Sequence, residues 1–147
     1  MSFSKSNSIK EIIRVKKGKK QTWPFLEARV AAGFPSSAEN YIENSLDLNE
    51  LLITHPSATF FVRVKGDSMV GAGIYCGDIA VVDRSLTVSH NKVIIARLYD
   101  ELTIKRFCIE NDTYFLKPEN DAYELMEITP EMDFEVWGVV TYVIHSL

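Results

Sequence analysis

The sequence contains no run of apolar residues long enough to cross a lipid bilayer, which takes about 20 consecutive residues in a helix. Its basic N-terminus is not followed by an apolar stretch, so we expect no secretory signal. Together these absences predict a cytoplasmic protein without a membrane partner.

Cysteine and histidine are both scarce. Cys76 and Cys108 form neither a C-x-x-C pair nor a metal-type cluster, and we interpret them as two reduced structural thiols. His55, His90 and His145 have no spacing to a thiol that would indicate a cysteine protease. The sequence therefore predicts no metal site and no cofactor.

Charge is unevenly distributed along the 147 residues, whose net charge is −4. Residues 1–32 hold eight Lys/Arg and two Glu, a balance of +6, whereas residues 33–147 have a balance of −10. The densest basic run, residues 14–20, has the composition to contact DNA phosphates. We favour the alternative that it is a solvated arm that folds back on the acidic body.

Residues 1–32 have too few apolar side chains to form a core of their own. Their Ile9, Ile12, Ile13 and Val15 fit either a short strand or a helical turn, and residues 23–26 form an apolar island. Residues 33–37 are rich in Gly, Pro and Ser and predict a loop. We therefore expect a flexible arm over residues 1–32 and a folded domain over residues 33–147.

One short helix is expected directly after this loop. Ser36 and Glu39 have the spacing of a capping box. Apolar residues recur at helical intervals over residues 38–46, and residues 48–53 fit a further turn or two.

The remainder of the chain has the pattern of short strands. Apolar and polar residues alternate, or apolar residues run together, over residues 58–64, 79–83, 92–99, 102–109, 113–116 and 134–144. A hairpin turn is expected at Asp100 and Glu101, and the last segment, apolar on both faces, is expected to be buried on both. The sequence thus predicts a mostly-β fold: a curled, barrel-like body of short strands with one short helix and an N-terminal arm.

A candidate nucleophile follows the first of these strands, in the sequence Gly66-Asp67-Ser68-Met69. A serine in such a turn can be presented so that nearby backbone N–H groups, here those of Asp67 and Ser68, face a developing oxyanion. Taken alone, however, a serine in this context is more often a turn former.

A serine nucleophile needs a base, and Lys105 is the candidate. A lysine acts as a base only when neutral, so burial must lower its pKa from about 10.4. Lys105 interrupts an apolar strand, and alternation places it on the face of Thr103, whose hydroxyl can accept a hydrogen bond from the amine. The alternative is an ordinary strand lysine that points to solvent.

From about residue 33 onward the chain resembles the UmuD branch of the LexA-type serine peptidases. The resemblance rests on Gly66-Asp67-Ser68-Met69, on the G-D-x-x-x-V-D segment at residues 77–83, and on Thr103-Ile104-Lys105-Arg106. The interval from Ser68 to Lys105 is also similar, and Ala32-Gly33 matches the small residue–Gly bond that the family cleaves.

The resemblance implies a self-cleaving serine endopeptidase of the SOS response to DNA damage. Ser68 would be the nucleophile, Lys105 the general base and Ala32–Gly33 the scissile bond, with Thr103 in support. A recombinase filament on single-stranded DNA would stimulate cleavage, and the product, as a homodimer, would serve a Y-family translesion DNA polymerase.

Two other classes of function are weighed against this one. A cleavable repressor of the LexA type needs a helix-turn-helix domain, for which 32 residues without helical periodicity are too few. A non-catalytic polymerase-binding module has no need of Ser68 and Lys105, whose presence argues against it.

Overall fold

The computed structural model describes residues 8–16, 18–26 and 42–147. The described residues divide into two compact units. One lies within Lys16–Thr54, and the other combines the N-terminal segment up to Val15 with His55–Leu147. In the part of the chain described here, no helix is long and apolar enough to span a membrane.

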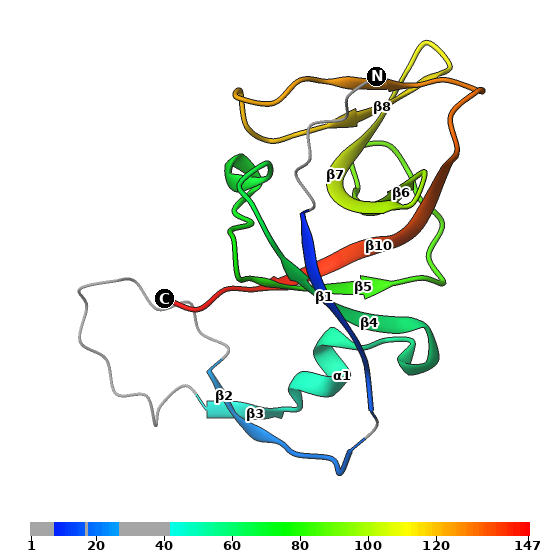
Figure 1. The fold of residues 1–147 in the computed structure, drawn as a ribbon. Helices are drawn as coiled ribbons and strands as arrows, with labels where there is room; N and C mark the ends of the chain where they lie inside the picture. Colours follow the sequence, from blue (N-terminus) through cyan, green and yellow to red (C-terminus); the bar gives the residue numbers. More distant parts are fainter. Residues whose placement is uncertain (1–7, 17, 27–41) are drawn as a thin grey trace. The chain divides into compact units, whose positions relative to one another are not determined.

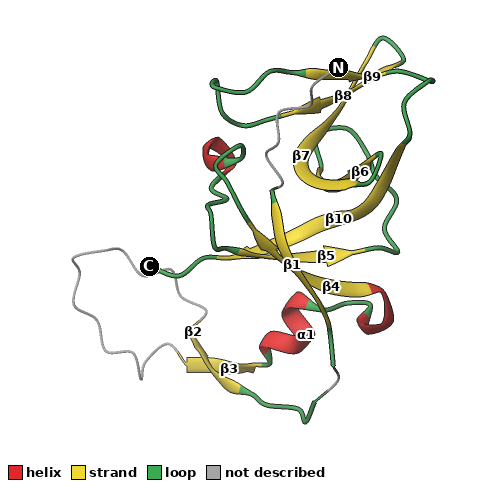
Figure 2. Cartoon of the chain, in the orientation of Figure 1, coloured by secondary structure: helices red, strands yellow, loops and turns green. Residues whose placement is uncertain are grey.

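The larger unit is built on one antiparallel sheet with the strand order β1-β4-β5-β10-β6-β7-β8-β9 (Figures 1 and 2). Its strands are β1 (Ile9–Arg14), β4 (Thr59–Val64), β5 (Ile79–Asp83), β6 (Val93–Leu98), β7 (Glu101–Glu110), β8 (Thr113–Lys117), β9 (Met126–Ile128) and β10 (Phe134–Ile144). Two single 3₁₀ turns flank β4, at Pro56–Ala58 and Val70–Ala72.

Strand β10 connects the two halves of this sheet. Its first half, from Phe134 to Val139, pairs with β6, and its second half, from Val139 to Ile144, pairs with β5. The register shifts once in each half, and bulges of this kind bend a strand and increase its twist. The long strand and the strands around it curl as a result, without closing into a barrel (Figure 2). The predicted mostly-β, curled body is confirmed.

The apolar core lies in two clusters. The larger one joins strands from both sides of β10, with the buried residues Ile9, Val62, Val64, Met69, Ile74, Ala80, Val82, Ile95 and Ile104. The smaller one contains Ile94, Ala96, Leu98, Phe107, Leu116 and Val139. Because the larger cluster draws on both β4 and β7, burial of its side chains favours the curled form of the sheet.

The smaller unit pairs β2 (Trp23–Leu26) with β3 (Ile42–Leu46) and continues into α1 (Leu48–Leu52). The Asp47 side chain caps this helix by accepting a hydrogen bond from Asn49 N at 2.8 Å. Lys20, from the basic run, pairs with Glu50 at 3.2 Å. The helical turns predicted at residues 48–53 are confirmed.

The helix predicted over residues 38–46 is wrong where the structure describes it, because Ile42–Leu46 form strand β3. The apolar island at residues 23–26 supplies the backbone partners that turn this segment into a strand. The helical spacing of a few apolar residues does not indicate whether a distant segment will pair with them as a strand. Residues 38–41 lie outside the described residues.

The strands predicted between residues 58 and 144 are confirmed, and the N-terminal isoleucines adopt the strand alternative as β1. Strand β9 was not predicted. Burial of β10 on both faces is wrong for its C-terminal end: Tyr142 and Ile144 are each 44% exposed, whereas Gly138 and Val139 are buried.

Candidate active site

Ser68 lies in the turn that follows β4. The chain leaves this strand at Val64 and reverses through Gly66, whose φ of +84° is a conformation that favours glycine. Met69, only 1% exposed, anchors the turn in the larger core cluster. The neighbouring Ser68 is consequently held at the surface of the core, with 3% of its area exposed.

Lys105 lies on β7, which is not adjacent to β4 in the sheet: β5, β10 and β6 stand between them. The curl of the sheet nevertheless brings the Lys105 amine to the turn after β4, and Lys105 Nζ lies 3.0 Å from Ser68 Oγ. The two residues that the sequence singled out are therefore hydrogen-bonded to each other.

Two further oxygens surround the amine. Lys105 Nζ donates to Thr103 Oγ1 at 2.9 Å and to the Ile104 carbonyl oxygen at 3.0 Å. Burial lowers the pKa of Lys105 from its ordinary 10.5 to about 8, because a charged amine is poorly solvated in this position. A neutral amine has two N–H donors and one lone pair. With both donors directed to Thr103 and Ile104, the lone pair is left for the hydroxyl of Ser68.

The turn that carries Ser68 is held from the far side by the segment between β8 and β9. Glu119 N donates to the Ser68 carbonyl at 2.8 Å, and Gly71 N donates to the Glu119 carbonyl at 2.7 Å. These two backbone bonds join both ends of the turn to one residue. The Glu119 side chain also pairs with Arg106 Nε at 2.5 Å, which ties the segment to β7.

Asp67, directly before Ser68, is fixed by the same segment. Asn120 Nδ2 donates to its backbone oxygen at 2.9 Å, and the Tyr123 hydroxyl donates to its carboxylate at 2.5 Å. The hydrogen bond to Asp67 raises the pKa of Tyr123 above its ordinary value. Sequence reasoning missed Glu119, Asn120 and Tyr123, because no local pattern relates them to residue 68.

The backbone N–H groups of Asp67 and Ser68 were predicted to face an oxyanion. Among the described residues, neither group donates to an acceptor of the protein. Both therefore have a free donor next to the serine hydroxyl. Ala32 and Gly33, the predicted scissile pair, lie outside the described residues.

The histidines have partners elsewhere. His55 Nδ1 lies 2.6 Å from Asp83 Oδ2, and His145 Nδ1 lies 2.5 Å from Asp78 Oδ1. His90 Nδ1 accepts from a backbone N–H of β7. Within the described residues, the basic side chain hydrogen-bonded to Ser68 is Lys105.

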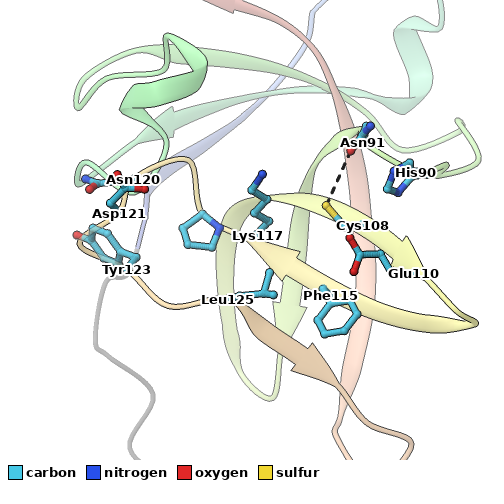
Figure 3. A pocket seen from close by; sticks show the side chains of 11 residues that line it. His90, Asn91, Cys108, Glu110, Phe115, Lys117, Asn120, Asp121, Tyr123 and Leu125 are labelled. Carbon is cyan, nitrogen blue, oxygen red and sulfur yellow. Dashed lines mark hydrogen bonds between the residues drawn. The ribbon is translucent and has the colours of Figure 1, made fainter.

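A pocket of about 410 Å³ lies beside the site, and Figure 3 shows the side chains that line it. Asn120 and Tyr123, the residues that hold Asp67, are at one end, and His90 and Asn91 are at the other. Cys108 lies between them with its Sγ 3.9 Å from Asn91 Oδ1. Ser68 does not line this pocket, whereas residues of the segment between β8 and β9 do.

Comparison with known proteins relates the chain to a peptidase family. The family model described as Peptidase S24-like matches residues 24–141. Protein MucA of Salmonella typhimurium is 44% identical over 125 residues, which cover 84% of this chain and 83% of MucA. Protein ImpA of Shigella flexneri is 43% identical over 122 residues, 83% of each chain.

A LexA repressor from Hahella chejuensis is also similar, with 39% identity over 114 residues that cover 76% of this chain and 56% of the repressor. The family model spans most of the chain, including the β4 turn and β7. These matches agree with the resemblance stated from the sequence. The chain belongs to the Peptidase S24-like family.

Proposed function

We propose that this protein is a self-cleaving serine endopeptidase in which Ser68 is the nucleophile, Lys105 is the general base and the Ala32–Gly33 bond is the substrate. The observation that carries the proposal is the 3.0 Å hydrogen bond between Lys105 Nζ and Ser68 Oγ. A lysine with a lowered pKa beside a serine hydroxyl is an arrangement that can activate the serine as a nucleophile without histidine.

The first step is proton transfer. With a pKa of about 8, roughly one tenth of the Lys105 side chains are neutral at pH 7, against roughly one in three thousand at a pKa of 10.5. The neutral amine takes the proton of Ser68 as the hydroxyl oxygen attacks the carbonyl carbon of Ala32. The free N–H groups of Asp67 and Ser68 are the candidate donors to the resulting oxyanion.

The second step breaks the peptide bond. Lys105, now protonated, returns its proton to the amine of Gly33, which leaves as the new N-terminus of residues 33–147. Water then hydrolyses the ester between Ser68 and Ala32 and releases residues 1–32. A small side chain at position 32 and none at position 33 allow the substrate backbone to approach the nucleophile closely.

For the cellular role we rely on the resemblance to the UmuD branch. The activator is a recombinase filament on single-stranded DNA formed after DNA damage. The processed protein, a cytoplasmic homodimer made of residues 33–147, serves a Y-family translesion DNA polymerase. Direct contact of the basic arm with DNA is not favoured, because Lys20 pairs with Glu50 and Arg14 lies 5.7 Å from the Phe60 ring.

The test is intact mass spectrometry of the purified full chain, incubated with and without recombinase, single-stranded DNA and nucleotide. We expect only the fragments 1–32 and 33–147, formed faster with the filament, and no fragments from Ser68→Ala. A new N-terminus other than Gly33 would overturn the assigned bond. Undiminished cleavage by Ser68→Ala would overturn the assigned nucleophile, and no cleavage even at alkaline pH would overturn the peptidase proposal.

A further inference from the structure

Ser8 is a polar residue buried in the larger unit, with 1% of its area exposed. It lies directly before β1, the edge strand that pairs with β4. Its backbone oxygen accepts a hydrogen bond from Lys65 N at 2.6 Å. Its side chain lies against β7: Ile104 N donates to Ser8 Oγ at 2.9 Å, and Ser8 Oγ is 2.8 Å from Thr103 Oγ1.

The part of β7 that Ser8 contacts has an open side. Strand β8 pairs with β7 only from Arg106 to Glu110, so Thr103 and Ile104 have a strand partner, β6, on one side alone. In an antiparallel strand the N–H and C=O of one residue point to the same side. Ile104 directs both to the open side, where Ser8 accepts from the N–H and Lys105 donates to the carbonyl.

Ser8 thus contacts both residues whose oxygens accept hydrogen bonds from the Lys105 amine. Those oxygens, Thr103 Oγ1 and the Ile104 carbonyl, determine where the two amine hydrogens point. They therefore also determine whether the lone pair faces Ser68. Whichever of the two hydroxyls donates in the Ser8–Thr103 bond, the Thr103 side chain is held in the rotamer that meets the amine.

We propose that Ser8 is a positioning residue for Lys105, so that the N-terminal segment supplies part of the site that later cuts it off. This inference rests on the proposed function. Because Ser8 precedes the Ala32–Gly33 bond, release of residues 1–32 removes it from the chain. In the cleaved product the Ile104 N–H and the Thr103 hydroxyl lack their hydrogen bonds to Ser8. The Lys105 amine is then less well oriented toward Ser68.

The variants are made in the full chain. Ser8→Ala removes the hydroxyl, Ser8→Thr keeps one, and Ile9→Ala is the matched control, since it truncates the adjacent buried residue, the first of β1, and removes no side-chain hydrogen bond. Thermal unfolding of each variant, followed by circular dichroism, identifies conditions in which all are folded.

Two rates are measured from pH 7 to 10: release of residues 1–32, and labelling of Ser68 in the intact chain by a fluorophosphonate, followed by mass spectrometry. We expect Ser8→Ala to lower both by about tenfold or more, the scale that follows from misplacing a reacting group. Ser8→Thr should recover most of the loss, and Ile9→Ala should change the rates less than threefold.

A double-mutant cycle separates positioning from general destabilisation. If Ser8 acts through Thr103, then Ser8→Ala should slow labelling much less in a Thr103→Val background than in the wild type. Wild-type rates in Ser8→Ala, or an equal loss in Ile9→Ala, would overturn the inference and leave the proposed peptidase standing. Absence of both labelling and cleavage in the wild type would overturn the two together.

Discussion

Lys105 Nζ and Ser68 Oγ are 3.0 Å apart although β5, β10 and β6 separate their strands in the sheet. The distance between them is set by the curl of the sheet, and the curl depends on β10, which changes partner at Val139. Close packing against β5 restricts the path of β10 at Gly138, because a Cβ added there would lie 2.5 Å from Val82 Cγ1. The site is a product of the whole sheet and not of one loop.

The rate of cleavage is predicted to follow the titration of Lys105. Its pKa of about 8 lies below the ordinary 10.5 because of burial, so the neutral fraction rises about tenfold per pH unit below pH 8 and levels off above it. Wild-type self-cleavage, measured by gel or mass spectrometry from pH 6 to 11, should have that profile. Lys105→Arg should be inactive throughout, since arginine keeps its proton.

Lys105→Ala serves as the second variant in this series, because it removes the base without leaving a buried charge. It should also be inactive at every pH. A flat wild-type profile would contradict the assignment of Lys105 as the base, and so would any active Lys105→Arg preparation.

The same burial predicts a cost in stability. The unfolded chain binds a proton at Lys105 up to about pH 10.5 and the folded chain only up to about pH 8, so stability should increase between these values. Lys105→Met should therefore unfold with a free energy about 1–3 kcal/mol higher than wild type at pH 7, an advantage that shrinks by pH 10.5. Urea denaturation at both pH values measures it.

Lys92→Met is the matched control for this experiment, because the Lys92 side chain is exposed on the neighbouring loop. Its effect on the free energy of unfolding should be small. If Lys105→Met were less stable than wild type at pH 7 and showed the same pH dependence, the amine would not be the buried group described here.

A third prediction concerns self-association. Tyr75, Tyr142 and Ile144 are each 44% exposed, and the Tyr75 ring packs against His145, just after β10, with the ring centroids 5.0 Å apart and the planes tilted by 44°. Exposed apolar side chains gathered on one strand end are typical of a subunit contact. The protein should be a dimer at micromolar concentration, and Tyr142→Glu should shift it to a monomer in light scattering.

Leu86→Glu is the control, since Leu86 is 40% exposed but lies in the turn after β5. It should leave the dimer intact. A monomeric wild type would contradict the predicted assembly, whereas a dimer that resists Tyr142→Glu would place the contact on another surface.

The family resemblance paired Ser68 with Lys105 across the sheet. Apart from that pair, the parts of this site that sequence could predict are the local ones. Alternation along a strand has a period of two residues, so Thr103 and Lys105 had to share a face, and they are hydrogen-bonded in the structure. The turn at Gly66 could also be predicted locally, from a glycine just after a predicted strand. The catalytic roles of Ser68 and Lys105, and the scissile bond, remain predictions.

The other non-local parts could not be predicted. Ser8, Glu119 and Tyr123 reach the site through hydrogen bonds to residues 48 to 96 positions away in the sequence, and neither composition nor residue spacing indicates such contacts. The strand at Ile42–Leu46 illustrates the same limit, because its partner lies at residues 23–26. A segment of five residues takes its structure from what it pairs with.

The last prediction concerns Gly71, where the turn after Ser68 meets the segment between β8 and β9. A Cβ added at this position would lie 2.6 Å from the Glu119 backbone oxygen, the acceptor of the Gly71 N–H at 2.7 Å. Glu119 cannot move alone, because its own N–H donates to the Ser68 carbonyl. Gly71→Ala should therefore shift the nucleophile as well as strain the backbone.

We expect Gly71→Ala to lower the free energy of unfolding by about 1–3 kcal/mol, as overpacking does. Self-cleavage at a temperature where the variant is folded should fall by about tenfold or more, because a small misplacement of a reacting group has a large effect on rate. Gly18→Ala is the matched control, since a Cβ there meets nothing within 4 Å, and it should leave both quantities unchanged. A destabilised Gly71→Ala with a normal cleavage rate would show that the bonds through Glu119 do not position Ser68.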